Sequence, residues 1–221
     1  MEEELSWKNT FELFFLHKEL CIKRREIYEN MTKKQRQPNF PEDVSENIVR
    51  QAIILFEYVD CKWNIPRGDL KKIDKFGNIT KIEVKCFSST GPSSFGPNET
   101  WDELYFLDGT KFMSNHFKIY KIKLSNTDDL IQKFPLNKDG TTFGQQCIGL
   151  RRPRFLFKQL MTYIPEHIEV IFSGTINENG FCSDQSLLLK KIYDQIKYVS
   201  DKYSQMISDM KKISHQLRHN I

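Results

Sequence analysis

The stretch PRGDLKKIDKFGNITKIEVK, residues 66–85, decides the fold of this chain. Its last five residues alternate between charged and apolar, which is the period-two pattern of a β-strand with one buried face. Glu83 and Lys85 belong to the charged face and therefore point in the same direction. A turn signal, KFGN at residues 75–78, precedes this strand, so we expect a hairpin that brings Asp69 beside Glu83.

Two carboxylates and one ammonium group in a small site predict chemistry on a phosphate. The carboxylates of Asp69 and Glu83 repel each other at close range, and a hard divalent cation such as Mg²⁺ relieves that repulsion. Such an ion polarises a phosphoryl oxygen and lowers the pKa of a bound water. Lys85 can orient that water or offset charge on the phosphorus. The predicted reaction is phosphodiester hydrolysis.

The tripeptide acid-x-Lys is common and occurs four times in this chain. The copies that begin at Asp60, Asp69 and Asp209 lack the wider context. Only the copy at Glu83 combines an apolar strand pattern, a turn and an upstream Gly-Asp at hairpin distance. The alternative is an exposed hairpin whose charged face is simply solvated.

The arrangement Gly68-Asp69 followed by Glu83-Val84-Lys85 resembles the PD-(D/E)xK nuclease superfamily, although Gly68 replaces the usual proline. The sequence after the motif, CFSSTGPSSFGP, resembles small type II restriction endonucleases, and the likeness covers about residues 40–175. It implies an α/β fold with a central mixed sheet flanked by helices. It also implies a Mg²⁺-dependent, sequence-specific endonuclease for double-stranded DNA, which works beside a DNA methyltransferase in a restriction-modification system.

The resemblance further implies roles for individual residues. The expected catalytic residues are Asp69, Glu83, Lys85 and Glu46, and the expected metal ligands are Asp69, Glu83 and Val84. Glu46 resembles a glutamate that these nucleases often carry on the helix before the core sheet. An exposed glutamate, or one paired with Arg50 four residues later, is the alternative.

Two polar segments are expected to contact DNA. Residues 88–98 are rich in hydroxyl and amide side chains, which suit phosphates and base edges, although a flexible connection is the alternative. The sequence RRPR at residues 151–154 precedes an expected helix over residues 155–163, and cations at a helix N-terminus need an anionic partner. A solvated helix start is the alternative. The expected DNA-contacting residues are Ser88, Ser89, Thr90, Ser93, Ser94, Asn98, Arg151, Arg152 and Arg154.

Hydrophobic periodicity predicts the elements around the hairpin. One or two helices are expected over residues 5–28 and another over residues 41–56, and strands are expected over residues 57–64, 101–107, 117–124 and 167–173. Together these elements predict an α/β fold with a mixed sheet of four or five strands and the two acids at its open edge.

Composition restricts the kind of surface charge, the use of cysteine and the cellular location that we expect for the protein. A net charge of +4, from 33 basic and 29 acidic residues, predicts local basic patches rather than a uniformly positive surface. Five cysteines without CxxC spacing indicate neither a disulfide framework nor a zinc site. The acidic N-terminus lacks the basic start of a secretory signal, and no apolar run is long enough for a membrane span. A cytoplasmic location is expected.

The end of the chain carries a heptad pattern, with apolar residues alternating at spacings of three and four over residues 189–217. We expect a nuclease domain over residues 1–183 and a long helix within residues 184–221. So narrow an apolar stripe favours another helix as its partner, either the N-terminal helix of the same chain or the equivalent helix of a second subunit. A homodimer is favoured, because a duplex has two strands to cut.

Two other functions compete with the restriction enzyme. A junction-resolving or repair nuclease would use the same chemistry but would recognise DNA shape. A non-catalytic module would use the C-terminal helix to bind a protein partner.

Overall fold

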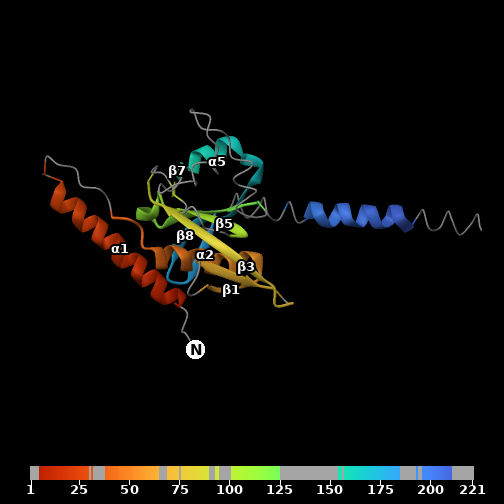
Figure 1. Ribbon diagram of the computed structural model, residues 1–221, viewed down its shortest axis with the longest axis horizontal. Coiled ribbons are helices and arrows are strands. Elements are labelled where there is room, and N and C mark those ends of the chain that lie inside the picture. Colours follow the sequence, from red (N-terminus) through yellow and green to blue (C-terminus); the bar gives the residue numbers. More distant parts are fainter. Residues whose placement is uncertain are drawn as a thin grey trace, which may run out of the picture. The chain divides into compact units, whose positions relative to one another are not determined.

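The structure is a computed structural model (Figure 1). It describes residues 5–29, 31, 38–64, 69–74, 76–89, 93–94, 101–124, 154–155, 157–184, 193 and 196–210. The chain divides into two compact units, residues 1–182 and residues 183–221.

A mixed sheet forms the centre of the first unit, and among the described residues it has seven strands in the order β1-β2-β3-β5-β6-β8-β9. The strands are β1 (Asp60–Trp63), β2 (Leu70–Ile73), β3 (Ile79–Phe87), β5 (Glu103–Asp108), β6 (His116–Ile122), β8 (Ile168–Asn177) and β9 (Gly180–Ser183). β3 and β5 run parallel, whereas β1–β2, β2–β3, β5–β6 and β6–β8 are antiparallel. A separate two-stranded sheet pairs β4 (Ser93–Ser94) with β7 (Arg154–Phe155).

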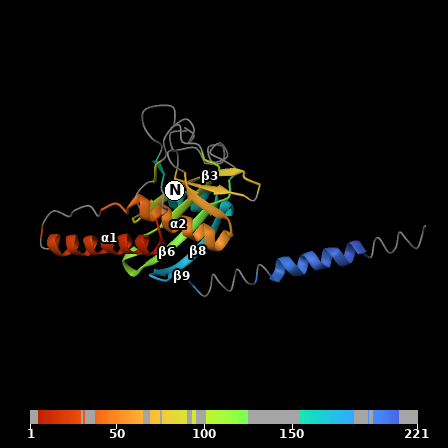
Figure 2. The same cartoon turned by 90° about the horizontal axis from the view of Figure 1, so that it is seen from below.

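The helices cover both faces of the large sheet. They are α1 (Trp7–Tyr28), α2 (Glu42–Glu57) and α5 (Phe157–Tyr163), with short 3-10 turns η1 (Phe112–Ser114) and η2 (Pro165–His167). α2 lies across one face with α1 beside it (Figures 1 and 2), and α5 lies on the opposite side (Figure 1). The expected α/β architecture with flanking helices is therefore confirmed.

Alternation along β3 and β5 sends side chains into two separate cores. Ile82 and Val84 belong to the core beneath α2, together with Ile48. Leu104 and Phe106 belong to the core beneath α5. Each large apolar side chain buried in this way contributes about 2 kcal/mol. Because Ile82 and Val84 pack beneath α2, alternation directs Glu83 and Lys85 to the opposite face of β3.

Several element bounds differ from those expected. The sheet has more strands than the four or five expected, partly because β9 extends it beyond the expected range. The expected strand over residues 57–64 is shorter because α2 continues to Glu57, and β8 continues beyond residue 173 to Asn177. The helix expected from residue 155 begins at Phe157, because Arg154 and Phe155 pair with β4.

The second unit contains a helix over residues 196–210, all of which are exposed. Its apolar side chains at the expected heptad positions, Ile196, Val199, Tyr203, Met206 and Met210, are all at least half exposed. The expected C-terminal helix is confirmed over this range, and the remainder of the heptad pattern lies outside the described residues. No described helix has the length and apolar character to cross a membrane.

Candidate active site

The expected hairpin is confirmed. β2 pairs with β3 in a register that places Leu70 opposite Ile82. In the turn between them, the carboxylate of Asp74 accepts hydrogen bonds of 2.8 Å from the backbone N–H groups of Phe76 and Asn78. Hydrogen bonds from the side chain and backbone of Asn78 lower the pKa of Asp74. Gly77 adopts a φ of 84°, a conformation that glycine takes without strain.

The hairpin brings Asp69 to Glu83. Asp69 directly precedes β2, so the register of the two strands continues to this residue and sets it opposite Glu83. The Oδ2 atom of Asp69 accepts a 2.7 Å hydrogen bond from the backbone N–H of Val84. This contact holds the first acid against the strand that carries the second.

Lys85 lies on the same face of β3 as Glu83, as the alternation predicts. Its ammonium group forms an ion pair with Oε1 of Glu83, and the two side chains are only 21% and 11% exposed. An ion pair with so little solvent around it is screened weakly, so its charges act strongly on any group that enters the site.

Glu46 adds a third carboxylate from the first half of α2. Burial, followed by the negative charges of Asp69, Glu42, Glu83 and Asp43, raises the pKa of Glu46 to about 7. Arg50, the alternative partner of Glu46, donates hydrogen bonds to the side chain of Asn47 and to the carbonyl of Leu5. Glu46 is therefore a partly buried carboxyl group whose ionised form is disfavoured first by burial and then by the neighbouring acids.

The donors at the hairpin fit a hard cation, because Mg²⁺ prefers carboxylate and carbonyl oxygens. Val84 can contribute only its backbone carbonyl. Within the described part of the chain, no three His, Cys, Asp or Glu side chains lie close enough together to hold one metal ion. From the described residues, a cation bound here would therefore take at most two carboxylates.

The chain matches the family model described as Bsp6I restriction endonuclease over residues 2–164. It belongs to this family. The expected type II restriction endonuclease is thereby confirmed, and the protein is a DNA-cleaving enzyme. No curated protein and no solved structure matches the chain. The matched range contains the hairpin and Glu46, and it ends just after α5. Family membership favours the enzyme over the non-catalytic module.

The Bsp6I-family enzyme brings together two of the segments expected to contact DNA. Ser94 in β4 is paired with Arg154 in β7, although sixty residues separate them in the sequence. Arg154 therefore belongs to a strand, so the expectation that it stands at the entry to a helix is wrong. Ser88 and Ser89 follow β3 directly. The other expected DNA contacts, Thr90, Asn98, Arg151 and Arg152, lie outside the described residues.

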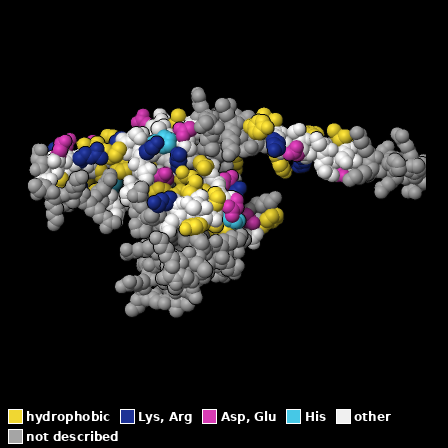
Figure 3. All heavy atoms as spheres, turned by 90° about the horizontal axis from the view of Figure 1, so that it is seen from above, with side chains coloured by type: hydrophobic (Ala, Val, Ile, Leu, Met, Phe, Trp, Pro, Cys, Tyr) yellow, Lys and Arg dark blue, Asp and Glu magenta, His cyan; other side chains and the backbone are white. Residues whose placement is uncertain are grey.

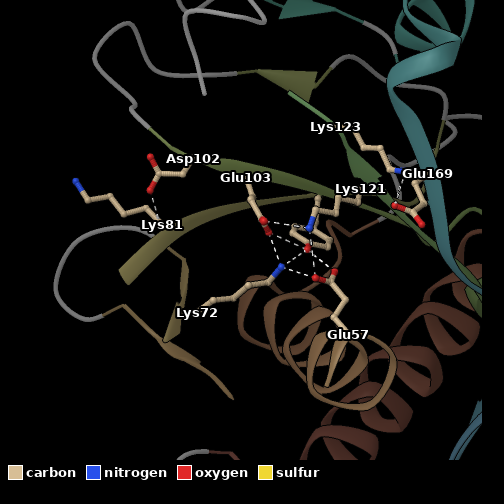
Figure 4. A network of polar contacts seen from close by, with 9 residues as sticks. Glu57, Lys72, Lys81, Asp102, Glu103, Lys121, Lys123 and Glu169 are labelled. Atoms are coloured by element: carbon tan, nitrogen blue, oxygen red, sulfur yellow. Dashed lines mark hydrogen bonds and ion pairs between the residues drawn. The ribbon is translucent and has the colours of Figure 1, made fainter. Parts of the chain in front are cut away.

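Periodicity did not reveal a second charged group in this Bsp6I-family enzyme, on the α2 face of the sheet (Figure 4). This charge cluster consists of Glu57, Lys72, Glu103, Tyr105 and Lys121. Lys72 donates to Glu57 and Glu103 at 2.5 Å and to the hydroxyl of Tyr105 at 2.6 Å. Lys121 contacts Glu103 at 3.0 Å and Glu57 at 3.3 Å. Two lysines therefore balance two carboxylates.

The titration of the charge cluster reflects this balance. Burial raises the pKa of Glu103, but hydrogen bonds and charges from Lys72 and Lys121 outweigh it, so the net shift is downward. Burial and the nearby carboxylates raise the pKa of Tyr105 far above its ordinary value, so its hydroxyl remains protonated and donates to Glu57. The sequence signal was Lys72, a charged residue at a position of β2 that alternation assigns to the buried face.

Proposed function

We propose that this Bsp6I-family protein is a Mg²⁺-dependent, sequence-specific endonuclease of the PD-(D/E)xK type, with Asp69, Glu83 and Lys85 at its active site. The observation that carries the proposal is the hydrogen bond from the N–H of Val84 to the carboxylate of Asp69. It unites, in one hairpin, the two halves of a motif that are separate in the sequence.

The carboxylates of Asp69 and Glu83 and the carbonyl of Val84 would hold the cation. When bound, Mg²⁺ supplies polarisation of a phosphoryl oxygen and a water of lowered pKa. Lys85 would donate to the attacking water or to a phosphate oxygen on which negative charge develops. Glu46, with a pKa of about 7, can hold or release a proton at its carboxylate near neutral pH, beside the two acids.

We also propose that the enzyme acts as a homodimer in the cytoplasm, beside a DNA methyltransferase that protects the host's own sites. Each chain contributes one such hairpin, and a duplex has two strands to cut. The exposed heptad stripe of the helix over residues 196–210 supports association with the same helix of a second subunit.

Digestion of a long duplex of known sequence tests the proposed function. Discrete fragments in Mg²⁺, none in EDTA, and a single sequence at all mapped ends are expected. Cleavage of branched DNA alone would favour a junction-resolving or repair nuclease. Absence of cleavage over many sequences, with Mg²⁺ or Mn²⁺, would contradict the proposal. Asp69→Asn should abolish the fragments, whereas the control Glu19→Gln, an exposed acid on α1, should leave them unchanged.

A further inference from the structure

Three lysines lie side by side across three neighbouring strands. The register pairs Lys62 of β1 with Lys71 of β2, and Lys71 with Lys81 of β3. Neighbouring strands are about 4.8 Å apart, so the three residues form a lysine row that crosses about 10 Å of the sheet.

The lysine row lies on the same sheet face as the two acids. Lys71 is two residues from Asp69, and Lys81 is two residues from Glu83. Since Leu70 pairs with Ile82, side-chain alternation directs all four charged residues to one face. Two residues along a strand correspond to about 7 Å. The neighbours Leu70 and Ile82 are fully buried beneath α2, whereas Lys81 is exposed. The row therefore lies on the outer side of the hairpin, close to the acids.

The charges of the lysine row are only partly offset. Asp60 contacts Lys62 at 3.4 Å, and both side chains are about half exposed. The carboxylate of Asp102 accepts a hydrogen bond from the backbone N–H of Lys81, whose ammonium group points away from the charge cluster (Figure 4). Among the described residues, no ion pair is formed by the ammonium group of Lys71 or Lys81.

Like charges directly opposite each other on paired strands destabilise a sheet. Lys71 faces such a charge on both sides, so the described part of the chain does not by itself explain the lysine row. Lys72, the next residue of β2, shows the contrast, because Glu57 and Glu103 neutralise it on the buried face. A polyanion that lies across the outer face would remove the repulsion.

We propose that Lys62, Lys71 and Lys81 bind backbone phosphates of the DNA next to the bond that is cleaved. This inference rests on the proposed function for the position of the scissile phosphate. An ammonium group is a point charge that contacts phosphate oxygens without reading bases. The lysine row thus positions the duplex over Asp69 and Glu83 and increases affinity for every sequence alike.

The test is the salt dependence of binding to a mixed-sequence duplex in Ca²⁺. We expect Lys71→Thr to reduce the slope of log affinity against log salt by about one, and the triple threonine variant to reduce it by about three. Lys23→Ala, which removes an exposed lysine that is paired with Glu26 on α1, is the matched control and should leave the slope unchanged. With DNA in excess, kcat should stay at the wild-type value while KM rises.

Thermal unfolding supplies a second readout. The threonine variants should unfold at the wild-type temperature or higher, because threonine favours strands and the repulsion is removed. A wild-type salt slope in the folded triple variant would overturn the inference. If the wild-type enzyme cuts no DNA but the triple variant still loses slope, the proposed function fails while the lysine row remains a DNA-binding surface.

Discussion

The hairpin of β2 and β3 and the charge cluster contain the same kinds of side chain but differ in their charge balance. In the charge cluster, two lysines and one tyrosine satisfy two carboxylates. At the hairpin, Lys85 pairs with Glu83, while burial and the negative charges of neighbouring acids, Asp69 first among them, raise the pKa of Glu46 to about 7. Removing one partner from a balanced buried group destabilises the fold, whereas an unbalanced group is suited to bind a cation and substrate.

Breaking the charge cluster should give the largest effect. Lys72→Met leaves Glu57 and Glu103 facing each other with Lys121 as their remaining lysine, and we expect a loss of about 3 kcal/mol in the free energy of unfolding. Urea denaturation measures this loss. Adding Glu103→Gln to Lys72→Met should recover part of it, because the second change removes one buried charge. A Lys72→Met variant of wild-type stability would show that the cluster does not stabilise the fold.

Removing charge from the hairpin should affect activity more than stability. Asp69→Asn and Lys85→Ala should each lower the cleavage rate at least about a hundredfold, as loss of a preorganised charge does. Urea denaturation should show Asp69→Asn to be as stable as the wild type within about 0.5 kcal/mol, because this side chain belongs to no hydrophobic core. Lys85→Ala leaves the buried Glu83 without its lysine, so this variant should be folded but less stable than the wild type. Wild-type turnover by either variant would contradict the assignment of the site.

Ionisation of Glu46 should make the free energy of unfolding depend on pH. Its pKa is raised in the folded protein, so ionisation costs stability as pH rises from about 4.5 to about 7, and that cost is then constant. Glu46→Gln should therefore match the wild type below pH 4.5 and be more stable by about 1–2 kcal/mol at pH 8, a value discounted for solvent screening. Urea denaturation at both pH values, in EDTA, measures the difference.

Adding Mg²⁺ tests whether the neighbouring carboxylates cause the difference in stability between Glu46→Gln and the wild type. The cation should diminish the advantage of Glu46→Gln at pH 8, since it offsets the carboxylates that repel Glu46. An advantage that is equal at pH 4 and pH 8 would show that packing, rather than charge, is responsible.

The smallest effect is expected at β7. Arg154→Ala should reduce the salt slope of DNA binding by about one if the arginine contacts a phosphate. If it reads a guanine, the loss of affinity should be confined to the cognate sequence. Binding to cognate and mixed-sequence duplexes separates these results, with Lys23→Ala as the control. Unchanged affinity for both duplexes would remove Arg154 from the DNA interface.

Basic side chains on the described surface lie among other kinds of residue. On the face that Figure 3 shows, lysines and arginines are interspersed with acids and apolar side chains. This agrees with the small net charge of +4. Affinity for DNA is therefore expected to depend on short arrangements such as the lysine row and not on one extended basic surface.

The hairpin could be predicted from the sequence because every signal for it is local. Asp74 and Gly77 form the turn, the turn determines the register, and alternation then places Glu83 and Lys85 on one face. The start of α5 could not be predicted in this way. Arg154 and Phe155 join β7 because a partner strand sixty residues earlier in the chain pairs with them.

By itself, therefore, the sequence determined the α/β class, the hairpin with Asp69 beside Glu83, and the heptad stripe near the C-terminus. Only the tertiary structure decided that Lys72 is neutralised while Lys71 forms no ion pair with a described residue, and that Glu46 lies within electrostatic reach of the hairpin acids. The physical reason is the distance along the chain over which each interaction acts. Turn geometry and alternation act over a few residues, whereas the partners of a buried charge come from elements that only packing brings together.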